Sequence, residues 1–455
     1  MAQEKQSSSS GVPLAILFAS AVYDVALDKL AASTVDHAKT ILIDALACVY
    51  AAPASLEDQA IAVAGEQSLP GSGGSTLIAS GRNAEPATAA LVNGAMLRSR
   101  DLMDVYAGRD VSHPSEIIPS ALAAAEVAGA SGRELLEAMV AGLCLHVTLA
   151  REMPVHPYGF HHTGHAAIVA PLVISRLLRL SREQAASVLN LTAGSLLVPE
   201  GFSRGQVTNL KTYAYGLQAK NAFTAVRQSR AGLCGSQQLL DEMAGLWSKF
   251  SGAPFNHGAL ADGLKPDLVE QIWLKRFPAQ YALQPLISAA CKLHEPGIAE
   301  RISHVQVFAS RRTVERCADA AKYAPKNAEA ADHSLPFCIC AALVDGSFSG
   351  DTLDKCRWQD AEIAELMGKL SAEAVSNDAG YAVGPQKLVL QMKDGTETSV
   401  AAEYPPDGSS WRDVAVEKLR CHAQGRVDAD AAISCINDIE DGSARNLFSI
   451  FQTHS

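Results

Sequence analysis

The chain is organised around one stretch, Asn93-Gly-Ala-Met-Leu-Arg-Ser-Arg-Asp101-Leu-Met-Asp104, which continues as Val-Tyr-Ala-Gly-Arg-Asp-Val-Ser-His113-Pro-Ser-Glu-Ile-Ile-Pro-Ser120. Two aspartates three residues apart end a helical pattern, and a glycine-containing loop then leads to His113. The residue before a proline is disfavoured in the α region, and proline is favoured in the first turn of a helix. The stretch therefore predicts an acid–base candidate, His113, on a loop between two helices, although a loop histidine can also merely cap or pack.

Length and composition bound the class of protein. A chain of 455 residues is too long for one compact core, so two domains are expected. Hydrophobic residues make up 48%, charged residues 19% and aromatic residues 6%, which is typical of a globular, helix-rich protein. The net charge of −11 argues against nucleic acid as the main partner, since phosphate binding needs a basic surface. A few cations converging in a cleft would still allow an anionic substrate.

The ten cysteines are scattered, without a Cys-x-x-Cys pair or a cysteine–histidine spacing that suits zinc. The one close pair, Cys338 and Cys340, lies in an apolar run. We expect reduced, mostly buried thiols in a cytoplasmic protein, and neither a metal cluster nor another cofactor.

The first residues imitate a secretory signal, because an apolar run over 11–22 follows Lys5. Glu4 cancels that positive charge, however, and the apolar pattern continues past Asp24 to Leu30. We therefore predict a first helix after a disordered tail over 7–10. No stretch reaches the roughly 20 uninterrupted apolar residues that span a bilayer, so no membrane partner is expected.

Apolar spacing predicts a run of helices over 33–50, 86–100, 115–128, 131–152, 164–180, 184–196 and 212–231. Ser131 with Glu134 and Ser181 with Gln184 have the capping-box pattern, which marks a helix start. These helices form a predicted all-helical domain over 1–268.

The pattern changes after Pro266. Residues 302–308 and 387–392 alternate with period two, and Asp394-Gly395 before 398–402 is a strong hairpin signal. Helices over 328–343 and 360–370 complete a smaller α+β domain with an antiparallel sheet over 269–427. The last segment, 428–455, is predicted to be helical again and to complete the first domain. The expected fold class is thus mainly α with a smaller α+β lid domain.

Three further motifs carry candidate residues. Gly159-Phe-His-His-Thr-Gly-His165 suggests zinc, but its spacing fits no standard zinc motif, so a substrate-facing histidine is favoured. Lys211 lies at a helix entrance, and Trp273-Leu-Lys-Arg-Phe-Pro-Ala-Gln280 places two cations between aromatic residues. Each has an ordinary structural reading, as a solvated lysine or a linker, and the Asp-His-Ser run at 332–334 can be an N-cap only.

These motifs, in this order and spacing, resemble the 2-methylcitrate dehydratase family, also called the MmgE/PrpD family. The resemblance runs through Asn-Gly, Asp-x-x-Asp, His-Pro-Ser, Ser-Gly-Arg-Glu-Leu-Leu, Gly-Phe-His-x-Thr-Gly, Lys-Thr-Tyr-x-x-Gly, Lys-Arg-Phe-Pro-Ala and Ala-Asp-His-Ser-Leu-Pro, and covers nearly the whole chain. It implies a homodimer of two-domain subunits with the active site in the cleft between a helical domain and a lid. It also implies action on small polycarboxylates without a metal: dehydration of 2-methylcitrate, decarboxylation of cis-aconitate, or epimerisation of iminodisuccinate.

Carried over by motif, the family's site falls on eleven positions of this chain. The resemblance implies catalytic residues Asp101, Asp104, His113, His161 and Lys211, and a substrate-binding set of Val105, Lys275, Arg276, Gln280, His333 and Phe337. The shared chemistry moves a proton beside a carboxylate, so cations are needed where negative charge develops. Histidine suits the proton transfers because its unperturbed pKa is near neutrality. Which histidine is the base stays open here.

Three departures bear on the substrate. Val105 replaces a common threonine, Gln280 replaces the histidine of the decarboxylases, and Phe337 replaces a frequent tyrosine. A dehydratase of 2-methylcitrate or a related hydroxy-polycarboxylate is therefore the leading interpretation, with decarboxylation weakened and epimerisation retained. The non-enzyme alternative is a helical binding protein that has lost catalysis.

Overall fold

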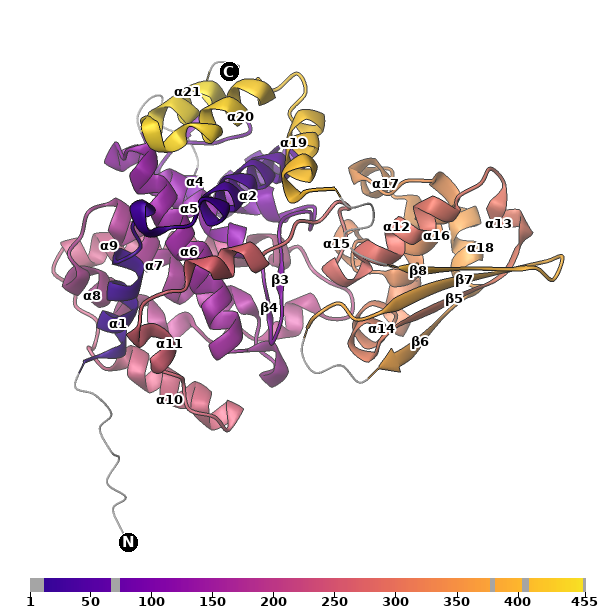
Figure 1. Ribbon diagram of the computed structural model, residues 1–455, viewed down its shortest axis with the longest axis horizontal. Helices are drawn as coiled ribbons and strands as arrows, with labels where there is room; N and C mark the ends of the chain where they lie inside the picture. The colour runs from indigo at the N-terminus through magenta and orange to yellow at the C-terminus, as the bar shows by residue number, and fades with distance from the viewer. Residues whose placement is uncertain (1–11, 67–73, 377–380, 403–408, 453–455) are drawn as a thin grey trace, which may run out of the picture.

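The computed structural model describes residues 12–66, 74–376, 381–402 and 409–452. It has a large helical part and a smaller part built on one sheet (Figure 1). The predicted tail over 7–10 lies outside the described residues. The mainly α fold with a small sheet-containing part agrees with the predicted fold class.

The larger part holds the helices predicted from apolar spacing. Its helices are α1 (Leu14–Tyr23), α2 (Ala32–Ala51), α3 (Ser55–Val63), α4 (Pro86–Arg98), α5 (Ile118–Ala128), α6 (Gly132–Glu152), α7 (Ala166–Leu177), α8 (Arg182–Thr192), α9 (Leu210–Arg230), α10 (Leu239–Ser251) and α11 (Gly258–Ala261). Short hairpins join β1 (Ser75–Thr76) to β2 (Asn83–Ala84) and β3 (Tyr106–Ala107) to β4 (Val111–Ser112). Both predicted capping boxes are formed, at the starts of α6 and α8.

Short 3-10 helices connect these elements. They are η1 (Leu27–Lys29), η2 (Pro114–Ile117), η3 (His156–Tyr158), η4 (His162–His165), η5 (Ala193–Ser195), η6 (Glu200–Ser203), η7 (Pro266–Gln271), η8 (Tyr281–Leu283), η9 (Ala320–Tyr323), η10 (Arg357–Gln359) and η11 (Ile439–Asp441). The helix predicted over 115–128 therefore starts with the 3-10 turn η2 that follows His113 and continues as α5.

The smaller part is a four-stranded sheet with the order β6-β5-β7-β8. Its strands are β5 (Ile302–Ser310), β6 (Leu370–Ser376), β7 (Gln386–Met392) and β8 (Glu397–Ala402). The predicted hairpin joins β7 to β8, with Gly395 at φ +87° in the turn. The sheet is mixed rather than wholly antiparallel, because β6 runs parallel to β5. β6 was not predicted, because the helix predicted over 360–370 runs to the first residue of this strand, whereas α18 ends at Met367.

Helices complete this part: α12 (Gln284–Leu293), α13 (Ile298–Arg301), α14 (Arg311–Cys317), α15 (Ala328–Ala331), α16 (Leu335–Asp345), α17 (Gly350–Asp354) and α18 (Ala361–Met367). The single helix predicted over 328–343 is broken between α15 and α16. Ser334 caps α16 by accepting the backbone N–H of Phe337. The break leaves Asp332 and His333 outside the helical pattern, where their side chains reach the site described below.

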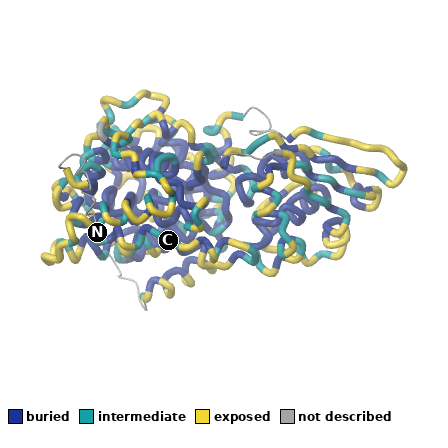
Figure 2. The backbone as a smooth tube through the Cα atoms, turned by 90° about the horizontal axis from the view of Figure 1, so that it is seen from below, coloured by how far each residue is buried: buried dark blue, intermediate teal, exposed yellow. Residues whose placement is uncertain are grey.

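The chain ends with α19 (Trp411–His422), α20 (Ala429–Asn437) and α21 (Arg445–Gln452), drawn in yellow beside the larger part (Figure 1). One apolar core joins residues from Leu14 to Leu274 with residues from Val414 to Phe451, and a second spans Ala279 to Ala402. Figure 2 shows the two concentrations of buried backbone. The chain thus rejoins the larger core with α19, before the predicted position 428. The domain boundaries themselves stay predictions.

Among the described residues, no single helix has both the length and the apolar character to cross a bilayer. Taken together, α2 and α3 meet those criteria, but the pair is bent by 98°.

Candidate active site

A small buried pocket collects side chains from both parts of the molecule. Its lining comprises Arg98, Asp101, Val111, His113, His156, His161, His162, Ser203, Lys211, Lys275, Gln280, Tyr281, Arg312, Arg316, His333 and Tyr381. Seven of the eleven predicted site residues belong to this lining: Asp101, His113, His161, Lys211, Lys275, Gln280 and His333.

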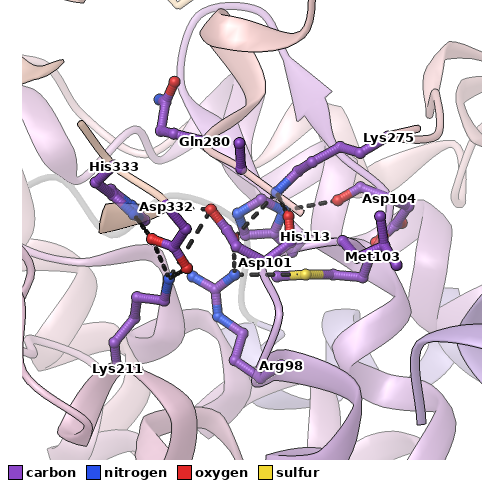
Figure 3. Close-up of polar contacts among 12 residues, drawn as sticks. Arg98, Asp101, Met103, Asp104, His113, Lys211, Lys275, Gln280, Asp332 and His333 are labelled. Atoms are coloured by element: carbon purple, nitrogen blue, oxygen red, sulfur yellow. Dashed lines mark hydrogen bonds and ion pairs between the residues drawn. The ribbon is translucent and has the colours of Figure 1, made fainter. Parts of the chain in front are cut away.

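Asp101 lies at the centre of the charged side of the pocket (Figure 3). Its Oδ1 accepts a hydrogen bond from Arg98 Nη1 at 2.7 Å and another from Lys275 Nζ at 3.0 Å. Lys275 Nζ also donates to the carbonyl oxygen of Asp101 at 2.7 Å. The Nζ of Lys211 lies 3.9 Å from Oδ2. Asp101 therefore lies among three cations, of which Arg98 also pairs with Glu116 and Lys211 with Asp332.

The backbone of Asp101 has φ +48°, a left-handed conformation that is rare outside glycine. Such strain persists only where surrounding contacts enforce it, and it is common at functional sites. Burial alone would raise the pKa of Asp101, but Lys211, Lys275 and Arg98 hold this pKa well below its ordinary value. Burial lowers the pKa of Lys275 to about 8, against the opposing effect of Asp101. Near neutral pH the charged side of the pocket is therefore a set of paired charges.

Lys211 reaches the pocket from the first turn of α9, which crosses α4 closely. The crossing is made by Gly94 and Gly216: a Cβ on Gly216 would lie 2.9 Å from the carbonyl oxygen of Leu91 in α4. Both glycines belong to the quoted motifs, so their role is to let the two helices approach. Lys211 Nζ then donates to Asp332 Oδ2 at 3.2 Å, in the break between α15 and α16.

His333 lies beside that contact. Its Nδ1 is hydrogen-bonded to Asp332, and its Nε2 lies 3.9 Å from Asp101 Oδ2. Burial and the charge of Lys211 lower the pKa of His333 to about 4, although Asp332 opposes the shift. His333 thus adds an uncharged ring to the charged side of the pocket.

His113 follows β4 and precedes η2. Its Nδ1 lies 2.7 Å from the carbonyl oxygen of Asp104. Because a carbonyl oxygen only accepts, Nδ1 carries the proton, and Nε2 is left with a lone pair. Burial, then the charges of Arg98 and Lys275, lowers the pKa of His113 well below its ordinary value. His113 therefore presents a neutral imidazole that can take up a proton.

Asp104 stabilises the loop that leads to Ser115 and does not contribute to the pocket. Its side chain accepts the hydroxyl proton of Ser115 at 2.5 Å and the backbone N–H of Ser115 at 3.0 Å, and it does not line the cavity. Burial raises the pKa of Asp104 to about 7, despite the hydrogen bonds from Ser115. The two predicted aspartates thus have opposite environments, and only Asp101 reaches the pocket.

His161 has the opposite tautomer to His113. Its Nδ1 lies 3.0 Å from the hydroxyl oxygen of Thr163 and accepts the backbone N–H of Thr163 at 3.3 Å. Because a backbone N–H only donates, whereas a hydroxyl can donate or accept, Nδ1 is the acceptor and Nε2 carries the proton of the neutral ring. Burial and the neighbouring rings of His162 and His156 lower the pKa of His161 well below its ordinary value. His161 therefore offers an N–H hydrogen-bond donor.

Two pocket histidines were missed as site residues. His162 was quoted in the glycine-flanked motif but given no role, and its ring lies 4.2 Å from that of His161 and 5.1 Å from that of His113. His156 donates from Nδ1 to Asp110 Oδ1 at 2.7 Å. The sequence offered one indication of His156 as a site residue, its position three residues before Gly159 in Val-His-Pro-Tyr-Gly.

Among the described residues, two groups have the spacing of metal ligands: His156 with His161 and His162, and Asp101 with Asp332 and His333. In the first group the N–H of Thr163 faces Nδ1 of His161 and keeps Nε2 protonated, which is the wrong form for a ligand. In the second group the carboxylates already pair with lysines. Neither set of donors fits a cation in its present hydrogen bonding.

Three predicted substrate-binding residues lie elsewhere. Arg276 lines a separate cavity with Arg100 and Lys418. Val105 packs in a small apolar cluster with Tyr281 and others, and its backbone pairs with Trp273. Phe337 is fully buried in the second core, with its ring centroid 5.7 Å from that of Phe348.

Gln280 does reach the pocket, where its Oε1 accepts the backbone N–H of Ala282 at 2.7 Å. Arg312 and Arg316, on α14, add cations that no motif indicated. Arg316 pairs with Glu200 from the larger part. Arg312 lies over the ring of Tyr381, 3.2 Å from its centroid. Their i, i+4 spacing on one short helix was the only signal in the sequence.

The helical part, the small mixed-sheet part and the acid–base pocket lined by both define the class of protein. The chain belongs to the MmgE/PrpD family: the MmgE/PrpD N-terminal domain matches residues 17–257, and the MmgE/PrpD C-terminal domain matches residues 277–440.

Its relatives include a decarboxylase and dehydratases. The chain is 26% identical over 336 residues to cis-aconitate decarboxylase of Homo sapiens, a match that covers 68% of this chain and 66% of the human protein. It is 25% identical to 2-methylcitrate dehydratase of Cupriavidus necator, over 70% of this chain and 71% of the relative. It is 25% identical to 2-methylcitrate dehydratase of Escherichia coli K12, over 74% of each chain. Such relatives support an enzyme of this family.

Proposed function

We propose that this protein is a lyase that acts on a small polycarboxylate by dehydrating 2-methylcitrate or a related hydroxy-polycarboxylate. The observation that carries the proposal is one buried pocket with paired cations on one side and the neutral imidazoles of His113 and His161 on the other. The dehydratase relatives support the same reaction class.

The cations explain how an acidic protein would bind a polyanion. Arg98, Lys211 and Lys275 gather around Asp101. Glu116 and Asp332 are further partners of Arg98 and Lys211, and Arg312 and Arg316 line the pocket from α14. Carboxylate groups of a substrate would find charge-assisted donors on both sides, in a site shielded from water.

His113 would take the proton from the carbon next to a carboxylate, because its Nε2 has a lone pair. The bound polyanion would raise the pKa of His113 toward neutrality, since a nearby negative charge favours the charged ring. His161 would donate its Nε2–H to the carboxylate oxygen on which charge develops. Lys275 and Lys211 would stabilise the same charge.

Gln280 favours dehydration over decarboxylation. Its carbonyl oxygen is bonded to Ala282, which leaves only the amide NH₂ for the pocket. An amide does not transfer a proton at neutral pH, so this position cannot protonate a carbanion that has lost carbon dioxide.

We also propose that the reaction needs no metal, because neither group with ligand spacing offers donors in the right form, and that the protein is a homodimer. Size-exclusion chromatography with light scattering would give the molar mass in solution. A monomeric mass would overturn the dimer.

The test of function is proton NMR of the purified protein with 2-methylcitrate, cis-aconitate and iminodisuccinate, in deuterium oxide with EDTA. An alkene formed from 2-methylcitrate supports the proposal. Itaconate from cis-aconitate would show a decarboxylase, and deuterium exchange without a new product would show an epimerase. The matched pair is His113→Gln, expected to be inactive, and His146→Gln, a buried histidine bonded to Tyr215 outside the pocket. If neither the wild type nor the variants convert any of the three compounds, the alternative of a helical binding protein that has lost catalysis is favoured.

A further inference from the structure

Asp110 and His156 form a buried carboxylate–imidazole pair beside the pocket. Asp110 lies in the turn between β3 and β4, fully buried, and its Oδ1 accepts the Nδ1–H of His156 at 2.7 Å and the backbone N–H of Val111 at 2.8 Å. Its Oδ2 accepts the backbone N–H groups of Val155 at 2.5 Å and of His156 at 3.1 Å. Both oxygens are thus engaged, and the ring of His156 is fixed in direction.

The ring of His156 lines the pocket, and Nδ1 is held by Asp110, so Nε2 is the nitrogen left to meet a substrate. No hydrogen bond from another described residue occupies Nε2. The ring centroid lies 5.3 Å from that of His161 and 5.4 Å from those of His162 and Tyr381. His162 contacts both His156 and His113, so the two rings flank it.

Dehydration needs a proton donor for the leaving hydroxyl, and the other three imidazoles of this side suit the task less well. His162 has its Nε2 turned to Glu116, 3.4 Å from Oε2. His113 has its lone pair toward the pocket. His161 would have to become an imidazolate to give up its proton, or place a second proton against the N–H of Thr163. The carboxylate beside His156 is closer, with Asp110 Oδ1 2.7 Å from its Nδ1, and it fixes the direction of the ring while leaving Nε2 toward the pocket.

We propose that His156, held by Asp110, is the general acid that protonates the leaving hydroxyl. This inference rests on the proposed dehydration. Nε2 of His113 takes the carbon-bound proton, the electron pair of that C–H bond forms the double bond, and the C–O bond breaks as Nε2–H of His156 gives its proton to the oxygen. Water leaves, His113 ends charged, and His156 ends neutral. Exchange with solvent restores both rings. Asp110 is a positioning residue that acts through His156.

The experiment compares 2-methylcitrate with its analogue in which fluorine replaces the hydroxyl group, because fluoride leaves with little need of a proton. The variants are His156→Gln, Asp110→Asn and His113→Gln. We expect His156→Gln to lower kcat for the hydroxy acid about 100-fold or more, with KM changed less than about threefold, and to lower kcat for the fluoro acid less than about fivefold. Asp110→Asn should follow the same pattern. His113→Gln should lose activity on both substrates.

Equal losses of His156→Gln on the two substrates would overturn the proposal, since a merely structural role would not discriminate between leaving groups. Unchanged activity of His156→Gln would overturn it as well. If the wild type dehydrates neither substrate, the proposed function fails, and the pair is then judged by ¹⁵N NMR of the histidine rings at pH 7. A charged His156 ring that becomes neutral in Asp110→Asn supports its capacity as an acid, and a neutral His156 ring in the wild type overturns it.

Discussion

The two sides of the pocket are built from different chemistry. On the charged side, Arg98, Lys211 and Lys275 are bound to Asp101 and Asp332, and every ion is buried. On the imidazole side, His113, His156, His161 and His162 contact each other, ring against ring.

The same burial acts differently on the two sides. Buried ions keep their charge only when paired, so Asp101 gathers the cations around it. Buried imidazoles can become neutral, and burial lowers the pKa of His113, His161 and His162. The charged side is therefore suited to bind a polyanion, and the imidazole side is suited to transfer its protons.

The largest effect is expected for Asp101→Asn, which leaves three buried cations without their shared carboxylate. Removing one partner from a buried ion pair costs about 3–5 kcal/mol of the free energy of unfolding. We also expect KM to rise and kcat to fall. Urea unfolding and steady-state kinetics measure these quantities. Asp354→Asn is the control, because Asp354 pairs with Arg100 but is 54% exposed, so it should cost less than about 1 kcal/mol. Equal costs for the two variants would contradict the central role of Asp101.

The second effect belongs to the imidazole side. His113→Gln should lower kcat by about 10²–10⁴-fold, because a general base is lost, while KM and the free energy of unfolding change little. Kinetics with 2-methylcitrate, together with urea unfolding, separate the two sides of the pocket. A variant that loses affinity but keeps kcat would show that His113 binds substrate instead of taking a proton.

The third effect is a pH dependence of stability. Burial lowers the pKa of His165 and of His333 to about 4, while the unfolded chain titrates near 6.5. Between these values the unfolded state binds more protons, so stability is fully present above about pH 6.5 and is lost as the pH falls toward 4. Each such histidine contributes about 1.4 kcal/mol per pH unit in that window.

Urea unfolding at pH 7, 6 and 5 measures this slope, and His165→Asn should make it shallower. Asp104 acts with the opposite sign, because its raised pKa of about 7 stabilises the fold below that pH. A free energy of unfolding that stays constant from pH 7 to 5 would show that the buried rings take up protons without cost.

The smallest effect is expected for Asp104→Asn. Asparagine keeps an oxygen that can accept from Ser115, and the raised pKa of Asp104 makes the charge dispensable near neutrality. We expect a loss of less than about 1.5 kcal/mol and a kcat within about fivefold of wild type, measured as for Asp101→Asn. A fall in kcat as large as that of Asp101→Asn would place Asp104 in the catalytic machinery.

Much of the fold could be predicted because it depends on local patterns. Ser131 and Ser181 start their helices as expected, and Asp394-Gly395 turns the β7–β8 hairpin. The parallel strand β6 could not be predicted, because its pairing with β5 joins residues more than sixty positions apart. The break at Asp332 was indicated only by the N-cap interpretation of the Asp-His-Ser run, which Ser334 confirms, while the alanines on both sides favoured one helix over 328–343.

By itself, the sequence determined the residue types of the site: Asp101 and His113 between two helices, His161 after a glycine, Lys211 at a helix entrance. These features depend on backbone preferences and side-chain size, which act over a few residues. Gly94 and Gly216 were visible in their motifs, but their meeting at the crossing of α4 and α9 was decided by the tertiary structure.

Only the tertiary structure decided which of these groups meet and in which protonation state. Lys418, on α19, donates to the carbonyl oxygens of Leu102 and Lys275 and so ties together the two loops that carry Asp101 and its lysine. The tautomers of His113 and His161 follow from one carbonyl oxygen and one backbone N–H. The physical reason is that charge and proton position depend on burial and on distant partners, which no local pattern records.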